Sequence, residues 1–490
     1  MKYLSFFLTV LPTFFFFSCS SKSSTTEDDL TISPLAPVPS EAQLNWHQME
    51  LNAFIHFTTN TFTDKEWGYG DESPDIFNPT EFDADQWVSV LKEVRFQGVI
   101  LTCKHHDGFV LWPSEYTNHS VEQSLWQDGK GDVVQAVSEA CRKHGLKFGV
   151  YLSPWDRNRV DYGQPSYITY YRNQLEELFT NYGPVFEMWF DGANGGDGYY
   201  GGANETREID RQTYYDWPTT LDMVRELQPK PDVIFFSDAG PGVRWVGNEQ
   251  GIAGETNWNT ITADTLYAGK AGINDLLASG SANGTSWIPA EVDVSIRPGW
   301  FYHASEDSLV KTPEQLFDIY LSSVGRGSTL LLNIPPDRRG LLHENDVASL
   351  RGWRKLLDKA FSQNLTADTE VKADSYRGEN AEFAPSQVTD NDYETYWATD
   401  DGVTTGSIEA DLGSEQTIQY VVLQEYIPLG QRVSKFSVDA WQNDKWQTIA
   451  EATTIGYKRI LPVDSVKTRK VRVNIEDAQA CPVISTVAVY

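Results

Sequence analysis

The chain of 490 residues is long enough for two or three domains, each with a hydrophobic core of its own. Its net charge of −30 argues against nucleic acids and anionic membrane surfaces as partners, because a polyanion is repelled by both. Aromatic residues make up 13% of the chain, with 16 tryptophans, which serves packed cores and flat sugar-binding surfaces equally well. Composition therefore predicts a soluble protein whose substrate is neutral or small.

The first residues have the pattern of a bacterial export signal. Lys2 supplies positive charge, and residues 4–17 form an apolar run that is too short to span a bilayer. The sequence FFSC that ends at Cys19 resembles the lipobox, in which the cysteine is lipidated. We therefore assign residues 1–19 to a lipoprotein signal peptide. We expect an exported protein, either periplasmic or at the outer membrane or cell surface, that contacts the membrane only through its lipid anchor.

Residues 20–43 are rich in Ser, Thr, Pro and acidic side chains, which predicts a flexible tether. The other three cysteines, Cys103, Cys141 and Cys481, are too widely spaced for a disulfide framework or a metal site. They are expected to be small buried side chains.

Residues 44–363 alternate apolar strands with amphipathic helices. The first expected strand is LNAFIHF at residues 51–57, and helices are expected over residues 84–94 and 132–145, the second ending at a glycine C-cap. The same alternation continues to a last helix near residues 346–362 and gives about seven strand candidates.

Parallel strands with crossover helices build either an open sheet or a closed (β/α)8 barrel. No Gly-rich phosphate loop follows the first strand, which argues against an open nucleotide-binding sheet. Polar residues instead come directly after several strands: His105, His106, Asp107, Asp156, Asp191 and Asp238. Because barrel active sites lie at the carboxyl ends of the strands, we expect a (β/α)8-type TIM barrel.

From residue 364 to 490 the pattern changes to short alternating strands joined by turn residues. This predicts a C-terminal all-β sandwich or jelly roll. The sequences TDNDYETYWATDDG and SIEADLG resemble the discoidin-like, galactose-binding modules that accompany many glycosidases. The resemblance implies a module that either binds sugar or braces the enzyme. It also leaves open a structural calcium ion, for which the sequence assigns no ligands.

The apolar segment EMWF at residues 187–190 ends in Asp191, whose carboxylate has two explanations. It either caps a helix or turn, or it is one of the two carboxyl groups that glycoside hydrolysis requires. Candidates for the second carboxyl group lie downstream: Asp238, Glu249, Glu255, Glu291 and Asp293.

Eight segments, in order over residues 45–362, resemble the α-L-fucosidases of glycoside hydrolase family 29: FIHFTTNTF, KEWGYG, KHHDGFVLW, GVYLSPWD, EMWFDG, RWVGNEQGIAGETNW, SIRPGWFYH and TLLLNIPPD. The resemblance implies a retaining double displacement in which Asp191 is the nucleophile. The triplet GNE resembles the branch that acts on α-1,3- and α-1,4-linked fucose, which implies Glu249 as general acid/base. Glu255, in the nearby GET, stays as the alternative.

The same resemblance implies which residues hold the fucose ring: His56, Glu66, Trp67, His105, His106, Tyr151 and Trp300. Imidazoles and a carboxylate suit ring hydroxyls, and aromatic side chains suit the apolar face and the methyl group of the sugar. The adjacent histidines also raise the question of a metal. Neighbouring residues on a strand point in opposite directions, however, and no third ligand has regular spacing. We expect no metal and no other cofactor in catalysis.

These observations predict an exported exo-glycosidase that releases terminal α-1,3/1,4-linked L-fucose from branched, Lewis-type glycans. The alternatives are a fucosidase of broader specificity that accepts α-1,2 links, and a non-catalytic fucose-binding surface protein. A nucleophile together with an acid/base candidate favours the enzyme. Because every proposed site residue precedes residue 363, the sequence also predicts that the barrel alone hydrolyses small substrates.

Overall fold

The computed structural model describes Met1 and residues 30–230, 232–367 and 369–490. Residues 34–490 form one compact unit, and the residues before them belong to a separate one. Apart from Met1, the predicted signal peptide lies outside the described residues, as does the tether up to residue 29. Among the described residues, no helix has the length and apolar character needed to cross a membrane.

The first helix of the main unit, α1 (Glu41–Met49), begins inside the stretch predicted to be a tether. Ser40 Oγ accepts a hydrogen bond from Gln43 N, and Gln43 Oε1 accepts one from Ser40 N, which is a reciprocal capping box. Gln43 Nε2 also donates to the carbonyl oxygens of Gly242 at 2.7 Å and Trp287 at 2.8 Å. The prediction of a tether is therefore wrong for residues 41–43, because this cap and these two bonds fix the chain there.

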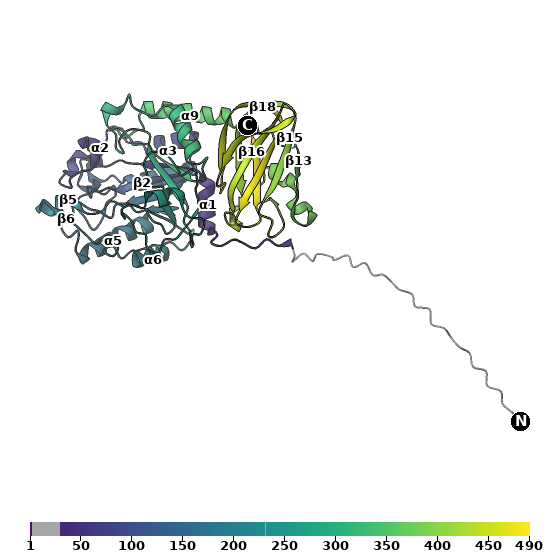
Figure 1. Ribbon diagram of the computed structural model, residues 1–490. Coiled ribbons are helices and arrows are strands. Elements are labelled where there is room, and N and C mark those ends of the chain that lie inside the picture. Colours follow the sequence, from purple (N-terminus) through teal and green to yellow (C-terminus); the bar gives the residue numbers. More distant parts are fainter. Residues whose placement is uncertain (2–29, 231, 368) are drawn as a thin grey trace. The chain divides into compact units, whose positions relative to one another are not determined.

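Eight parallel strands close into a barrel, which confirms the predicted fold class (Figure 1). In order around the barrel these are β1 (Leu51–Ile55), β12 (Thr329–Asn333), β11 (Ala290–Ser295), β8 (Val243–Trp245), β7 (Ile234–Ser237), β4 (Glu187–Trp189), β3 (Lys147–Leu152) and β2 (Gly98–Lys104). Most barrel strands are buried along their whole length, as expected where helices cover a barrel and side chains fill its interior.

Helices surround the barrel strands: α2 (Thr59–Thr63), α3 (Ala84–Glu93), α4 (Val133–His144), α5 (Pro165–Asn181), α6 (Trp217–Leu227), α7 (Asn274–Ser279), α8 (Pro313–Ser322) and α9 (Glu344–Ala360). Helix α4 shows how local sequence sets their ends. Asp132 caps it by accepting from Gln135 N at 2.8 Å, and Gly145 ends it at φ 68°, a left-handed conformation that glycine adopts readily. The predicted glycine C-cap is thus confirmed.

Strand β8 is the barrel strand that the sequence pattern missed. It is three residues long, and its central residue is Arg244, a charged side chain that is fully buried. The Arg244 guanidinium donates to the carbonyl oxygens of Leu277 at 2.8 Å and Trp258 at 2.9 Å. No helix separates β8 from β7, because only residues 238–242 connect the two strands. A search for apolar runs that alternate with helices therefore passes over it.

Two insertions carry short antiparallel pairs of strands. Residues between β4 and α6 contain β5 (Gly196–Gly198) paired with β6 (Glu205–Arg207). The connection from β8 to β11 contains β9 (Thr260–Ile261) paired with β10 (Ser286–Trp287). Both insertions follow the carboxyl ends of barrel strands, where a barrel presents its functional loops.

The C-terminal part is a seven-stranded antiparallel sheet (yellow-green in Figure 1), which agrees with the predicted all-β class. Its strands are β13 (Glu370–Ala373), β14 (Trp397–Ala398), β15 (Gly406–Glu425), β16 (Val433–Gln442), β17 (Lys445–Ala452), β18 (Arg459–Ala478) and β19 (Val483–Val489). Inward-facing residues such as Ile418, Phe436 and Val473 build a hydrophobic core of its own. Strands β15 and β18 run the full length of the domain, which we call the sandwich.

Candidate active site

A cavity of about 350 Å³ opens at the carboxyl ends of the barrel strands. Its lining includes Asp191, Glu249 and every residue that the sequence assigned to the fucose ring except Glu66. The lining also contains Asp238 and Asp293, two of the candidates for the second carboxyl group. The lining residues without a predicted role are Phe54, Trp189, Gly192, Ala193 and Trp245. A larger cavity of about 460 Å³ lies at the opposite end of the barrel, beside Trp46 and Phe148, and contains none of the predicted site residues.

Asp191 lies two residues beyond β4, where the strand directs its carboxylate to the cavity. Its Oδ2 accepts a hydrogen bond from the Tyr151 hydroxyl at 3.0 Å, and its Oδ1 accepts one from Ala193 N at 2.6 Å. The Asp191 side chain is 23% exposed, so a substrate can reach it. Burial raises the pKa of Asp191, and the two hydrogen bonds oppose this by stabilising the carboxylate.

His106 is held as a neutral ring whose tautomer can be inferred. The Ser153 hydroxyl donates its only hydrogen to the Trp155 carbonyl at 2.7 Å, so Ser153 Oγ must accept from His106 Nδ1, also at 2.7 Å. The lone pair of His106 therefore lies on Nε2, 3.8 Å from Asp191 Oδ2. Burial lowers the pKa of His106 to about 3, which keeps the ring uncharged.

The same logic applies to His56. The Asn333 amide nitrogen donates to Ser295 Oγ at 2.9 Å and to the Trp300 carbonyl at 2.8 Å, which leaves Asn333 Oδ1 facing His56 Nδ1 at 2.8 Å. His56 Nδ1 is therefore the donor and Nε2 the acceptor. Burial lowers the pKa of His56 to about 3. Two neutral imidazoles thus offer acceptor nitrogens, which suits the hydroxyl groups of an uncharged sugar.

His105 completes the group of imidazoles, and it corrects one expectation. Its ring stacks on Tyr151 at an interplanar angle of 13° and lies 4.1 Å from the His106 ring, centroid to centroid. Both histidines line the cavity, because they follow the end of β2 at Lys104 and no longer alternate as strand residues do. The expectation that they point in opposite directions is wrong. Burial lowers the pKa of His105 well below its usual range.

Glu249 lies four residues after β8 and is exposed at the rim of the cavity. Its Oε2 accepts a hydrogen bond from Trp300 Nε1 at 3.3 Å. Partial burial of the carboxyl group raises the pKa of Glu249, and the nearby charges of Asp191 and Glu66 raise it further. Glu249 therefore keeps its proton to a higher pH than an isolated glutamate, as a general acid requires.

Three predicted residues lie outside the cavity lining: Glu66, Glu255 and the fully buried Glu291. The Glu255 side chain is 83% exposed and pairs with Arg326 at 3.6 Å, next to the sandwich. Glu66 lies behind Trp300: its Oε2 accepts from Trp300 N at 2.8 Å, and its Oε1 accepts from Phe301 N at 3.3 Å and lies 2.6 Å from His303 Nε2. Glu66 thus holds the segment that carries Trp300.

Trp67 and Trp300 are among the tryptophans that line the cavity. Trp67 is 51% exposed and packs edge-on against His106, with ring centroids 5.2 Å apart. Trp300 lies 5.3 Å from the His56 ring, again between centroids. The floor is formed by Trp189, whose ring stacks on Phe236 at 3.9 Å. These flat surfaces match the apolar face of a sugar ring.

Two further carboxyl groups reach the cavity, Asp238 and Asp293, which the sequence named only as alternatives to Glu249 for the second carboxyl group. Burial raises the pKa of Asp238 to about 6, and the charge of Asp191 adds to the shift. Burial also raises the pKa of Asp293 well above its usual range, with Glu249 as the next cause. Asp293 Oδ1 accepts from Trp245 Nε1 at 2.8 Å. Their position at or near the carboxyl ends of β7 and β11 explains why both lie at the cavity.

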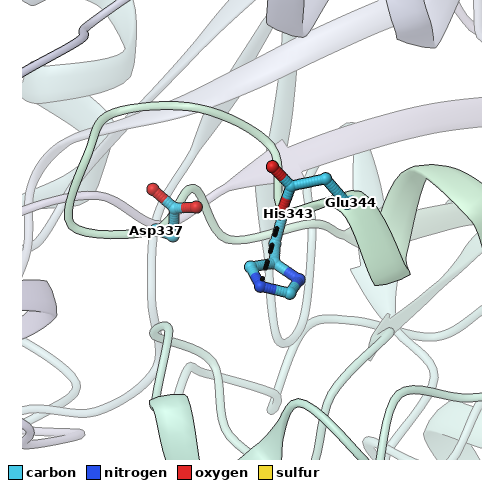
Figure 2. A group of neighbouring side chains, drawn as sticks. All are labelled: Asp337, His343 and Glu344. Carbon is cyan, nitrogen blue, oxygen red and sulfur yellow. Dashed lines mark ion pairs between the residues drawn. The ribbon is translucent and has the colours of Figure 1, made fainter.

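Among the described residues, a single group of side chains is close enough together to hold a metal ion: Asp337, His343 and Glu344 (Figure 2). Arg339 already forms ion pairs with both carboxylates of this group. Its Nη2 lies 2.6 Å from Asp337 Oδ2, and its Nη1 lies 2.9 Å from Glu344 Oε1. None of the three residues lines the cavity. The group is therefore an arginine-centred ion-pair cluster, away from the site.

Comparison with known proteins assigns the family. The sequence profile described as Alpha-L-fucosidase matches residues 35–360, and the profile described as F5/8 type C domain matches residues 365–487. This chain belongs to the alpha-L-fucosidase family, glycoside hydrolase family 29. The sandwich is accordingly an F5/8 type C domain.

Relatives support this assignment over nearly the whole chain. Alpha-L-fucosidase 1 of Arabidopsis thaliana is 39% identical over 486 residues, which cover 97% of this chain and 93% of that protein. A crystal structure of a glycoside hydrolase 29 family member from an unknown rumen bacterium is 44% identical, with a TM-score of 0.83, and the match covers 93% of this chain and 78% of the other. The Ruminococcus gnavus GH29 fucosidase in complex with fucose is 33% identical, with a TM-score of 0.85 and coverage of 96% and 97%.

The enzyme is therefore an alpha-L-fucosidase with an appended F5/8 type C domain. The neutral imidazoles, the bordering indoles and the accessible carboxyl groups form one cavity at the end of the barrel where such enzymes act.

Proposed function

We propose that this fucosidase is a retaining exo-enzyme that releases terminal α-1,3- and α-1,4-linked L-fucose from branched glycans. One observation carries the proposal: Asp191 and Glu249 line the same cavity as the neutral histidines His56, His105 and His106. The cavity volume of about 350 Å³ suits a single terminal sugar with part of its neighbour, as exo-cleavage requires.

In the first step, the Asp191 carboxylate attacks the anomeric carbon while the bond to the leaving sugar breaks. Glu249 donates its proton to the departing oxygen, so the leaving group departs as a neutral alcohol. In the second step, Glu249 takes a proton from water, and the water oxygen attacks the anomeric carbon and releases Asp191. The bonds from Tyr151 and Ala193 N hold the nucleophile in one orientation throughout.

The electrostatics suit this division of roles. Asp191 must be ionised and Glu249 protonated in the free enzyme. Both pKa values are raised by burial, and the charge of Asp191 itself helps to keep Glu249 protonated. Activity should rise as pH passes the pKa of Asp191 and fall as Glu249 loses its proton, which gives a bell-shaped profile.

The scheme uses no metal and no organic cofactor, since two carboxyl groups supply both the covalent step and the proton transfers. A structural calcium ion in the sandwich remains an expectation from the sequence resemblance, without assigned ligands. Membership of the α-1,3/1,4 branch is supported by the position of Glu249 within the GNE triplet, at the cavity rim.

We further propose that the enzyme is an exported lipoprotein, anchored through Cys19 and periplasmic or displayed at the cell surface. This proposal rests on the positive charge of Lys2, the apolar run over residues 4–17 and the sequence FFSC that ends at Cys19. A Cys19→Ala variant expressed in a Gram-negative bacterium should move from the membrane fraction to the soluble fraction. Retention of that variant in the membrane would contradict the anchor.

Specificity is tested with purified oligosaccharides, by comparing kcat/KM on three substrates. We expect the Lewis a or Lewis x trisaccharide to be cleaved much faster than fucosyl-N-acetylglucosamine without galactose, and α-1,2-linked fucosyllactose hardly at all. Proton NMR during the reaction should show the α anomer of fucose first, as retention requires. A preference for the α-1,2 link would identify the broader type of fucosidase, and initial release of the β anomer would overturn the retaining mechanism.

A further inference from the structure

The segment that carries Glu249 is held at its far end by the C-terminal domain. Residues 246–259, which we call the 246–259 loop, leave the barrel at β8 and end where β9 begins. Glu249 lies near the start of this loop, at the cavity. The last residues of the loop, 255–259, contact the sandwich through main-chain and side-chain hydrogen bonds.

Gln431 makes the central contact. Gln431 is only 4% exposed. Its Oε1 accepts hydrogen bonds from Asn259 N at 2.8 Å and from Asn259 Nδ2 at 3.1 Å. Its Nε2 donates to the Asn257 carbonyl at 3.0 Å. A buried amide that is satisfied entirely by one loop fixes both the direction and the distance of that loop.

Three neighbouring contacts hold the same stretch. Thr454 Oγ1 accepts from Asn257 N at 2.9 Å, and the hydroxyls of Thr453 and Thr256 lie 2.9 Å apart. Arg459 Nη1 donates to the Glu255 carbonyl at 2.7 Å. The sandwich thus bonds main-chain groups of Glu255, Asn257 and Asn259, whereas the main-chain groups of Trp258 bond to Ser279 and Arg244 of the barrel domain.

The middle of the loop depends on the sandwich indirectly. Arg326 Nη1 donates to the Ala253 carbonyl at 2.8 Å. Arg326 itself forms an isolated antiparallel bridge with Arg459 at the start of β18, and Ile460 N donates to the Gly325 carbonyl at 2.9 Å. The barrel turn that supports Ala253 is therefore bonded to the first residues of β18 in the sandwich.

Glu249 has little else to hold it. Its only side-chain hydrogen bond among the described residues is the one from Trp300 Nε1, at 3.3 Å. The adjacent turn is closed on itself by Asn248, which bonds Ile252 O at 2.8 Å and Gln250 N at 3.0 Å. The direction of the Glu249 carboxyl group therefore depends on where the two ends of the loop are fixed.

We propose that the sandwich positions the general acid: Gln431 and Thr454 fix the 246–259 loop so that Glu249 meets the glycosidic oxygen. This inference rests on the proposed role of Glu249. It gives the F5/8 type C domain a part in the chemical step through positioning residues that never touch substrate. It predicts impaired acid catalysis in a barrel without the sandwich, whereas the sequence led us to expect that the barrel alone hydrolyses small substrates.

The test measures kcat/KM in the full chain on two aryl α-L-fucosides, one with a dinitrophenyl and one with a phenyl leaving group. A good leaving group needs no proton, so only the phenyl substrate reports on acid catalysis. Gln431→Ala and the isosteric Thr454→Val should each lose about 10-fold on the phenyl substrate, because small misplacements of a catalytic group are costly. Both variants should stay within about twofold of the parent enzyme on the dinitrophenyl substrate.

Two controls separate positioning from general destabilisation. Gln419 is exposed, and its side chain bonds Ser465 within the sandwich, so Gln419→Ala should change neither substrate. Ile475→Val removes one methylene from the sandwich core and should lower the melting temperature without the selective loss. If Gln431→Ala does not fold, Thr454→Val, which keeps the side-chain volume, carries the test.

Glu249→Gln, measured in parallel, distinguishes the positioning role of the sandwich from the proposed catalytic role of Glu249. A selective loss in Glu249→Gln and none in Gln431→Ala or Thr454→Val overturns the positioning role alone. An equal loss on both substrates in the sandwich variants also overturns it, because acid catalysis is then not the step affected. If Glu249→Gln itself shows no selectivity for the phenyl substrate, the proposed function of Glu249 fails.

Discussion

Strand β4 carries one carboxyl group at its start, Glu187, and another just beyond its end, Asp191, and their surroundings differ sharply. Glu187 is fully buried, accepts from Trp46 Nε1 at 3.1 Å and faces a second buried carboxyl group, Glu291. Asp191 is 23% exposed, accepts from Tyr151 and lines the cavity. Only three residues thus lie between a carboxyl group buried in the barrel and one that a substrate can reach.

The buried pair is most stable with a proton between its members. Glu187 Oε1 and Glu291 Oε2 have no donor among the described residues, and a proton on one carboxyl group supplies it. Burial raises the pKa of Glu187 well above its usual range, and burial likewise raises that of Glu291. At the rim, burial also raises the pKa of Asp191, but donors there stabilise the ionised form.

The comparison shows that burial alone does not make a carboxylate catalytic. Both sites raise pKa values by desolvation, as buried carboxyl groups generally do. What differs is access for the substrate and the presence of donors that hold the charged form in one direction. Four measurements test this distinction, ordered from the largest expected effect to the smallest.

Asp191→Ala should reduce kcat/KM on every fucoside by at least about 10³-fold, because the covalent step is lost. Added azide should restore part of the rate and yield fucosyl azide. Glu187→Gln is the matched control on the same strand, and it should keep activity within about threefold because Gln still accepts from Trp46. Near-normal turnover of Asp191→Ala would remove the nucleophile assignment.

Glu249→Gln should reduce kcat/KM on a phenyl fucoside by about 10²-fold or more, and far less on a dinitrophenyl fucoside. Turnover of the dinitrophenyl substrate should begin with a pre-steady-state burst of released dinitrophenol, because hydrolysis of the fucosyl-enzyme is slow without the general base. Glu255→Gln is the control: its side chain is 83% exposed beside Arg326, so we expect no change. The opposite pattern in the two variants would reassign the acid/base to Glu255.

Tyr151→Phe should lower kcat/KM by about 10-fold, because it removes one charged hydrogen bond to the nucleophile. The Tyr151 hydroxyl stabilises ionised Asp191, so its loss raises the pKa of that carboxyl group. The acid limb of the pH profile should consequently move to higher pH, with the alkaline limb little changed. A loss of activity with no movement of the acid limb would show that Tyr151 acts only on substrate binding.

Glu291→Gln tests the sealed pair through stability. Raised pKa values mean that the folded state binds more protons than the unfolded state above the ordinary glutamate pKa. The free energy of unfolding therefore falls as pH rises from that point through the raised pKa values, by about 1.4 kcal/mol per pH unit for each extra proton that the folded state holds. Glu291→Gln removes one such group and should flatten this slope.

Urea unfolding at pH 5, 6 and 7 gives the slope for the parent and for Glu291→Gln. Replacing Glu415 by Gln serves as a control, because Glu415 is exposed on the sandwich and has no contact with the buried pair. An unchanged slope in Glu291→Gln would mean that the buried pair is already ionised in the folded state. The difference between the sealed and the accessible carboxyl groups would then have to be explained by access alone.

The sequence by itself determined the features that depend on short stretches of chain. Apolar runs such as LNAFI and caps such as Asp132 and Gly145 fixed strands and helices where they were expected. The same holds for the placement of Asp191 directly after a buried strand. These are local effects, because periodic burial and terminal hydrogen bonds involve residues a few positions apart.

Only the tertiary structure decided the rest. The buried Arg244 makes β8 look unlike a barrel strand in the sequence. Its guanidinium donates hydrogen bonds to the carbonyl oxygens of Leu277 and Trp258, and no local sequence pattern indicates these partners. Glu66 accepts a hydrogen bond from Trp300 N, although the two residues are more than 230 positions apart in the sequence. The Glu255 side chain pairs with Arg326, whereas Glu249 lines the cavity. The direction of a loop side chain is set by partners distant in sequence, as with Gln431 and Asn259, which are 172 residues apart. Such contacts exist only once the barrel and the sandwich have folded and packed together, so the sequence could name the candidates but could not choose between them.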